Sequence, residues 1–391
     1  MNRICGEKIK INDLSFNIPW ILLVTNTIIA QSYLSKFSMR AITIVCIIAL
    51  LCRIIWISKF RKYEIVYIVL FGMLGLIISI VSKDNRMLWL AITLSASINT
   101  DFYKLIKLTF KIVLIEVLLI VTSCLLLYGN IGTSLKGGLA LGMGHPNILH
   151  GIVTILCSMF IYIKYDRLNA GHILLIEQMN FFIYLFTFSR TGFISVSVTL
   201  LMVLLYKIFP TKYLLKFIAV VTMIMILIFT MIPIFYQHFP NSKWLILFDN
   251  KLTGRLWQSR WYYRMSGIKF FGNYFEELNK ANPYALLDMG FFRLLIEYGI
   301  LAYLLIIFGY LGVIWKAIRN NDVGEFFLSI SMMVFTCIES LGTYVFFNIT
   351  FLSFGMVLFK NNSKKAGIYS KKDQVRRTIK YDKSDYIYFN I

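Results

Sequence analysis

Long apolar runs, each close to the length of one membrane crossing, recur along this chain from Ile18 to Phe359. A helix needs about 20 mostly apolar residues to cross the hydrocarbon core of a bilayer. Hydrophobic residues make up 58% of the chain and charged residues only 15%, whereas about 25% of the residues in a soluble domain are charged. The runs are continuous and do not alternate, as the strands of a membrane barrel would. The sequence therefore predicts an all-α polytopic membrane protein.

The apolar runs predict about twelve transmembrane helices. The fourth run is short enough to be tilted or re-entrant, which leaves about eleven spans as the alternative. The expected spans are residues 18–35, 39–58, 63–82, 86–99, 108–128, 147–164, 171–188, 191–209, 214–235, 289–315, 325–341 and 344–360.

Lysine and arginine indicate the orientation of these spans. They are denser in one set of alternate loops, with Lys59, Arg61 and Lys104 among them, and basic loops stay on the cytoplasmic side. We therefore expect both termini in the cytoplasm and residues 1–360 as the membrane domain. Loops 129–146 and 236–288 are then external, and the large second one joins the ninth and tenth spans.

The remaining residues, 361–391, form a basic tail. We expect this cytoplasmic tail to be disordered on anionic membrane lipids. The same electrostatic preference explains the net charge of +21, so the charge does not predict nucleic-acid binding. The six cysteines show no CxxC pair and no Cys/His cluster, so the sequence predicts no metal site.

The external loop 236–288 combines basic and aromatic residues. If residues 252–271 are helical, the helix is amphipathic and lies in the membrane interface. Arg264 flanks its apolar side. The apolar side consists of Trp257, Trp261, Met265 and Ile268. The opposite, polar side consists of Arg255, Ser259, Tyr262 and Ser266. Arg255 then points either to water or to the helix bundle. Simple interfacial anchoring is the alternative to a binding role for this helix.

Two further stretches place unusual side chains at predicted outer helix starts. Arg190 opens the eighth span in FSRTGF, where a positive charge opposes the helix dipole unless an anion is bound. The alternative is an arginine paired with lipid headgroups. His145 precedes Pro146 in GMGHPNILH, where it is either a base or a helix cap.

Ionisable residues also begin the predicted tenth span, in the stretch LLDMGFFRLLIEYGIL. Asp288 lies at its outer start, and Arg293 and Glu297 follow one turn apart. Charged residues in a span usually face the bundle interior and mark function. The alternatives are an N-cap at Asp288 and a self-neutralising pair of Arg293 and Glu297.

Common energy-coupling and hydrolase motifs are missing: the sequence contains no GxxxxGK[ST], Asp-x-Asp, HExxH or GxSxG. Four other short motifs, in this order, resemble those of the Wzy-type polysaccharide polymerases and O-antigen ligases. They are GHPN at 144–147, SRTG at 189–192, LTGRLWQSRWYY at 252–263 and DMGFFRLLIEYGI at 288–300.

This resemblance implies a metal-independent, inverting glycosyltransferase that needs no cofactor. The implied enzyme acts on the outer face of the bacterial cytoplasmic membrane and extends a polysaccharide from undecaprenyl-diphosphate-linked oligosaccharide units. A flippase and a chain-length regulator of the same pathway are the implied partners. The chain departs from the family where ligases carry a histidine in place of Asp288. It also departs in the arginine–glycine spacing, for which Arg255 and Gly267 come nearest.

The resemblance and the residue chemistry together define an expected site. Arg190 and Arg255 are expected to stabilise the diphosphate leaving group, and Asp288 or His145 to accept the proton of the attacking hydroxyl. The residues expected to bind substrate are Arg260, Arg264, Tyr262, Trp257, Trp261, Arg293 and Glu297. A glycan ligase, a lipid-linked oligosaccharide flippase or other transporter, and an assembly scaffold are the competing interpretations.

Overall fold

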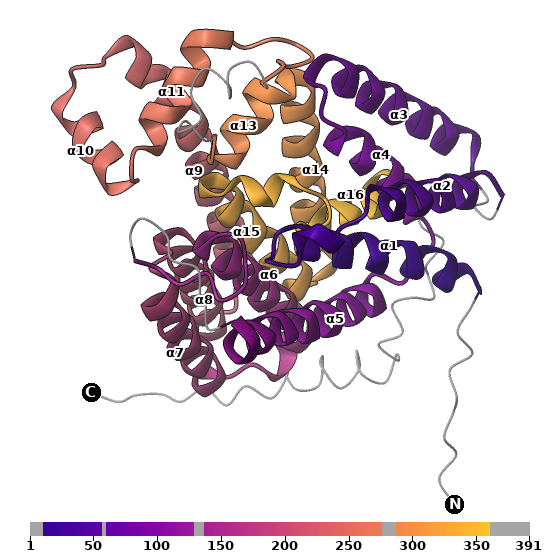
Figure 1. Cartoon of the computed structure of the whole chain (residues 1–391), viewed down its shortest axis with the longest axis horizontal. Coiled ribbons are helices and arrows are strands. Elements are labelled where there is room, and N and C mark those ends of the chain that lie inside the picture. Colours follow the sequence, from indigo (N-terminus) through magenta and orange to yellow (C-terminus); the bar gives the residue numbers. More distant parts are fainter. Residues whose placement is uncertain (1–10, 57–59, 129–136, 276–286, 360–391) are drawn as a thin grey trace, which may run out of the picture. The chain divides into compact units, whose positions relative to one another are not determined.

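The computed structural model describes residues 11–56, 60–128, 137–275 and 287–359. The regular elements in these ranges are all helices (Figure 1). The main helices are α1 (Ile11–Ala30), α2 (Arg40–Trp56), α3 (Lys62–Ser82), α4 (Arg86–Ala96), α5 (Phe102–Ser123), α6 (Pro146–Lys164), α7 (Ala170–Thr187), α8 (Arg190–Ile208), α9 (Lys212–His238), α10 (Lys243–Lys251), α11 (Arg255–Ser266), α13 (Gly290–Glu297), α14 (Gly299–Asn320), α15 (Val323–Ile338) and α16 (Thr350–Leu358). Short turns of helix add η1 (Ser35–Phe37), η2 (Cys124–Tyr128), η3 (Tyr165–Arg167) and η4 (Ser340–Thr343).

Seven of the described helical stretches are long and apolar enough to cross a membrane. They correspond to α1, α3, α5 with η2, α6 with η3, α8, α9 and α14. The prediction of an all-helical membrane protein is therefore confirmed. The count of twelve spans and the orientation stay predictions, and the basic tail lies outside the described residues.

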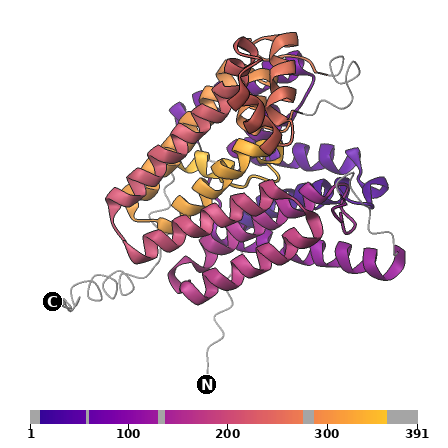
Figure 2. The same cartoon turned by 90° about the vertical axis from the view of Figure 1, so that its left-hand side faces the viewer.

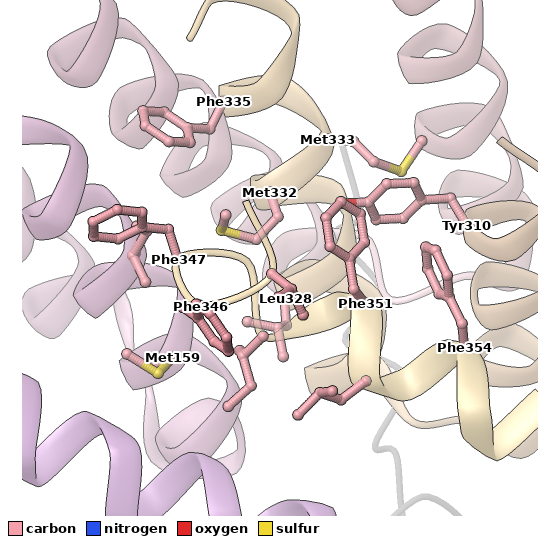
Figure 3. Close-up of a cluster of buried hydrophobic side chains, with 14 of the residues drawn as sticks. Met159, Tyr310, Leu328, Met332, Met333, Phe335, Phe346, Phe347, Phe351 and Phe354 are labelled. Atoms are coloured by element: carbon pink, nitrogen blue, oxygen red, sulfur yellow. The ribbon is translucent and has the colours of Figure 1, made fainter. Parts of the chain in front are cut away.

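The centre of the bundle is α15, whose residues from Gly324 to Ile338 are all buried. A helix that is apolar all round belongs in the interior, and α15 packs against α6, α8, α9 and α14. Large aromatic and methionine side chains fill the space around it (Figure 3). In the same core, Tyr310 of α14 lies with its ring centroid 5.1 Å from that of Phe354.

Polar contacts cross this core where helices approach closely. The Ser331 hydroxyl of α15 lies 2.6 Å from the Ser158 hydroxyl of α6, and it accepts a hydrogen bond from Thr199 of α8 at 3.2 Å. Small hydroxyl residues let neighbouring helices approach and join them by hydrogen bonds inside a membrane.

Helix α9, the longest described helix, runs beside α14 (Figure 2).

The predicted tenth span, 289–315, is wrong as a single helix, because the chain breaks between α13 and α14. Gly299 has φ +88°, a left-handed conformation that suits glycine. The segment after α11 docks onto this break: Ile300 donates its N–H to Lys269 O at 3.0 Å, and Asn273 donates to Glu297 O at 3.0 Å. A Cβ on Gly272 would lie 2.0 Å from Glu297 O, so the two segments touch backbone to backbone.

Three other predicted boundaries differ from the structure. Helix α1 spans 11–30 where we expected 18–35, and α11 spans 255–266 where we expected 252–271. The region predicted as the last span, 344–360, begins with a turn and holds only the short α16. Its apolar composition reflects burial against α14 and α4, because periodicity does not distinguish a buried short helix from part of a span.

Candidate functional site

Helix α11 lies against the bundle through one face. Its buried residues include Arg255, Ser259 and Tyr262, whereas Trp257 and Met265 are exposed. The predicted polar side is the buried one, and Arg255 points to the bundle. The predicted apolar side is only half as expected, because Trp261 and Ile268 pack partly against the protein core. The buried face joins a small apolar core between α9, α11 and α13.

Asp249 of α10 fixes the start of α11. Its carboxylate accepts hydrogen bonds from Leu256 N at 2.8 Å and from Trp257 N at 3.3 Å, which caps the helix from seven residues away. Burial raises the pKa of the Asp249 carboxyl, while the two N–H groups act in the opposite direction. Gly254 turns into the helix at φ +83°.

The Arg255 guanidinium lies among acceptors from two segments. Its Nη2 is 2.8 Å from Glu339 Oε1 and 3.4 Å from Asp288 Oδ2, and Nη1 donates to the Ile338 carbonyl. Arg255 and Glu339 are only 4% and 5% exposed. Burial alone would lower the pKa of Arg255, but the carboxylates of Glu339 and Asp288 outweigh it and raise that pKa. The guanidinium therefore keeps its charge in a buried setting.

Glu339 also joins this cluster to the start of α8. The Thr191 hydroxyl donates a hydrogen bond to Glu339 Oε1 at 3.0 Å. Close backbone packing brings Asp288 to the same place: a Cβ on Gly290 would lie 2.5 Å from Thr336 O and 2.8 Å from Glu339 O. Segments from three of the resembling motifs thus meet at the Arg255–Glu339 ion pair. We call Thr191, Arg255, Asp288 and Glu339 the arginine–carboxylate cluster.

Two hydroxyls beside the cluster lack hydrogen bonds within the described part of the chain. Ser189 Oγ, two residues before Thr191, is buried without a partner, and so is Ser259 Oγ, one turn after Arg255. A buried hydroxyl without a hydrogen bond is unfavourable by roughly 1–3 kcal/mol. Such groups are suited to bind a polar ligand.

The structure places Arg190 outside the cluster. It is the first residue of α8 and is exposed, and its side chain makes no hydrogen bond or ion pair with another described residue. Its neighbour Thr191 is the residue that reaches Glu339. Arg190 therefore lies at the rim of the site, with its charge available to an anion.

His145 lies away from the cluster and forms a cap. Its Nδ1 accepts a hydrogen bond from Asn147 N at 3.1 Å at the start of α6. His150, one turn along, is fully buried and lies 2.9 Å from Asn180 Oδ1 through Nε2 and 3.0 Å from Thr187 Oγ1 through Nδ1. The sequence left two roles open for His145, a base and a helix cap. The geometry shows the cap.

The other predicted binding residues of α11 divide by exposure. Arg264 and Trp257 are exposed, whereas Tyr262 is buried with its ring centroid 4.7 Å from that of Phe275. Arg260 donates to Gln237 Oε1 at 2.9 Å, and Trp261 packs edge-on against Tyr262. Tyr262 is therefore a packing residue here, while Arg264 and Trp257 are open to a ligand or to lipid.

Arg293 and Glu297 form an ion pair one turn apart on α13, as the self-neutralising alternative requires. Arg293 also lines a cavity of about 490 Å³ at the same end of the bundle. The other lining residues come from the α3–α4 junction, from the segment after α15 and from the end of α1. They are Gln31, Lys83, Asp84, Asn85, Arg86, Trp89, Ser340, Leu341, Tyr344 and Phe347. Because Ser340 follows Glu339, the cavity and the arginine–carboxylate cluster lie on adjacent residues of one segment.

Neither the family models, nor the curated proteins, nor the solved structures gave a match to this chain. Within the described ranges, His, Cys, Asp and Glu side chains nowhere group in a way that could hold a metal ion. The candidate site thus rests on its own geometry.

Sequence reasoning assigned no role to Glu339. An acid inside an apolar span marks it as a candidate, but its partners lie 84 and 148 residues away along the chain, so no partner is visible in the sequence. The cap at Asp249 and the cavity residues Lys83 and Arg86 were missed.

Proposed function

We propose that this chain is a membrane glycosyltransferase that polymerises lipid-linked oligosaccharide units on the outer face of the bacterial cytoplasmic membrane. The observation that carries the proposal is the meeting of three segments at one ion-pair cluster: Thr191 and Arg255 both contact Glu339, and Asp288 contacts Arg255. Thr191, Arg255 and Asp288 come from motifs that resemble, in order, those of the polymerase family, and residues that share one reaction are expected to lie in one site.

The chemistry of the cluster suits transfer from a diphosphate. A glycosyl diphosphate is already activated, so the reaction needs stabilisation of negative charge as the diphosphate leaves. Arginine holds phosphate oxygens through paired N–H groups. Arg190 at the rim supplies a charge open to a ligand, and Arg255 supplies a second one behind it. In the present conformation Arg255 is bound by carboxylates, so a phosphate has to displace Asp288, the longer of the two contacts.

Asp288 is the better placed of the two candidate bases. Its side chain is 28% exposed and its carboxylate lies at the edge of the cluster, whereas His145 Nδ1 is engaged in its cap. We propose that Asp288 accepts the proton of the attacking sugar hydroxyl. The hydroxyl oxygen then bonds to the anomeric carbon of the donor sugar while the bond between that carbon and the diphosphate breaks. The leaving lipid diphosphate takes the electron pair of that bond.

Glycan electrophoresis tests the proposal. Cells lacking the chain are complemented with wild type, Arg255→Ala, Arg255→Lys or the control Lys251→Ala, which removes an exposed charge in the same loop. We expect a polymer ladder from wild type and from the control. We expect single units on the lipid carrier from Arg255→Ala, and a strongly reduced ladder from Arg255→Lys because lysine lacks the planar fork.

Membrane content of each variant is measured in parallel, because removing Arg255 leaves two carboxylates without their partner. Arg255→Lys keeps the positive charge beside the carboxylates. A reduced ladder from this variant at normal membrane content therefore indicates lost phosphate recognition and not misfolding. A normal ladder from both Arg255 variants would refute the site. Full-length polymer stranded on its carrier would replace the polymerase by a ligase, and an unchanged glycan profile in cells lacking the chain would favour a transporter.

A further inference from the structure

The cavity beside the arginine–carboxylate cluster has no assigned role. We propose that it binds an acidic sugar of the repeat unit, meaning a sugar ring that carries a carboxylate or phosphate group. This inference rests on the proposed function and deepens it by naming the substrate class. It is carried by the cationic side chains of the cavity and by the mixed character of its wall.

Positive charge exceeds negative charge along the cavity wall. Lys83, Arg86 and Arg293 line it with Asp84 as the single lining carboxylate. Asp84 Oδ2 lies 3.4 Å from Arg86 Nε, and Glu297 pairs with Arg293 from outside the lining. The Nζ of Lys83 lies over the Tyr274 ring, 4.1 Å from the ring centroid. Its ammonium therefore has no carboxylate partner among the described residues and is free to meet an anion.

The backbone holds Lys83 in a conformation that lysine seldom adopts. At the end of α3 it has φ +53°, where a side chain other than glycine or asparagine is disfavoured by about 1 kcal/mol or more. Lys83 is the C-cap residue of α3, and a residue in this conformation often ends a helix. Its side chain lines the cavity beside the turn that opens α4.

The rest of the wall matches a sugar ring rather than a bare phosphate. Trp89 and Tyr344 present aromatic surface with their ring centroids 6.0 Å apart. Gln31, Asn85 and Ser340 add amide and hydroxyl groups that can bond to sugar hydroxyls. A volume of about 490 Å³ lies in the range of small-molecule sites. Apolar faces with a few polar groups are suited to a carbohydrate, and the surplus cations suit an acidic one.

The predicted topology gives these charges added weight. Lys83 and Arg86 join the third and fourth predicted spans on the outer side, where lysine and arginine are less common than on the cytoplasmic side. Cations retained there serve a local purpose. Under the proposed function, Arg190 and Arg255 bind the lipid diphosphate, so the cations of the cavity are assigned to an anion on the glycan.

Ligand binding to the full chain in lipid nanodiscs tests the proposal. Saturation-transfer NMR compares methyl glucuronoside and glucose 6-phosphate, which are acidic, with methyl glucoside, which is neutral. We expect an acidic sugar to bind at least about tenfold more tightly, the value of one charge-assisted hydrogen bond. The double variant Lys83→Gln/Arg86→Gln is expected to lose this preference, and the control Lys251→Gln to retain it.

Each probe has a defined outcome. Preference for the carboxylate or for the phosphate supports the proposal and identifies the anionic group. Equal affinity for acidic and neutral sugars would overturn it, as would a preference that survives the double variant. Inorganic pyrophosphate is the competitor: if it binds more tightly than both acidic sugars and loses affinity in the double variant, the cavity serves the lipid diphosphate instead.

The composition of the lipid-linked unit separates this inference from the proposed function. Units that accumulate in cells with Arg255→Ala are released and analysed for uronic acids and for sugar phosphates. A neutral unit would overturn the acidic-sugar site while leaving the polymerase intact. An undisturbed ladder in cells lacking the chain would refute the polymerase, whereas the binding preference of the purified chain would still be decided by the NMR comparison.

Discussion

The two arginines of the proposed site lie in different environments. Arg255 is 4% exposed and bonded to groups from two other segments, so its removal leaves the buried Glu339 carboxylate without its cation. Breaking a buried ion pair from one side is destabilising by about 3–5 kcal/mol. Arg190 is exposed and makes no hydrogen bond or ion pair with another described residue, so it can be changed without that penalty.

Arg190→Ala is therefore the cleaner probe of charge at the rim. We expect it to abolish the polymer, because a cation that faces an anion only in the reaction contributes to the transition state. Its thermal stability should match wild type, since exposed substitutions usually change stability by no more than about 0.5 kcal/mol. Gel analysis of the glycans and thermal unfolding of the purified chain measure the two effects. A full ladder from this variant would remove Arg190 from the site.

At the scale of elements, the loop predicted to be external is fastened to the bundle at both ends of α11. Arg255 at its start contacts Ile338 and Glu339, and the residues after it bond to the break between α13 and α14. Gly272 and Gly299 make that second attachment possible: a Cβ on Gly299 would lie 2.4 Å from Gly272 N. The position of Arg255 thus depends on glycines that lie outside α11.

Gly272→Ala tests this attachment. Alanine is strained at φ +91°, and its Cβ would meet backbone at 2.0 Å, so we expect a loss of more than about 1 kcal/mol and a reduced ladder. Gly72→Ala is the matched control, because a Cβ there has nothing within 4 Å, and alanine favours a helix. Thermal unfolding in detergent compares the two. Equal unfolding temperatures would show that the loop does not depend on this contact.

The sequence was most informative where periodicity was long. The apolar runs predicted a helical membrane protein, and helical spacing placed Arg255, Ser259 and Tyr262 on one face of α11, which the structure shows to be buried. Two kinds of feature were hidden. The break before Gly299 lies inside the predicted tenth span, and the contacts of Glu339 join residues far apart in the chain. Backbone turns and long-range pairs leave no periodic signal in one sequence.

For the whole molecule, the site requires one end of the bundle to face outward. The start of α8, helix α11, the α3–α4 junction and the segment after α15 gather at that end through the cluster and the cavity. The loop that joins α8 to α9 follows the far end of α8. Orientation in the membrane is therefore a direct test of the predicted topology.

Cysteine labelling measures this orientation. We expect an impermeant maleimide to label Lys251→Cys in intact cells, and Lys212→Cys only after the membrane is opened, because Lys212 begins α9 at the other end. Wild type provides the background from the native cysteines, of which Cys46, Cys124 and Cys337 are buried. Labelling of Lys212→Cys in intact cells, with Lys251→Cys protected, would reverse the topology and place the site in the cytoplasm.

The hydrogen bonds of the Ser331 hydroxyl limit how the helices of this bundle can move. It is hydrogen-bonded to α6 and to α8 at once, so it joins α15 to both of these helices. Sliding α15 by one helical turn, about 5.4 Å, would break both bonds where water is not present to replace them. We therefore expect α6, α8 and α15 to stay fixed relative to one another. A transport mechanism in which α15 slides past α6 and α8 would have to break both hydrogen bonds.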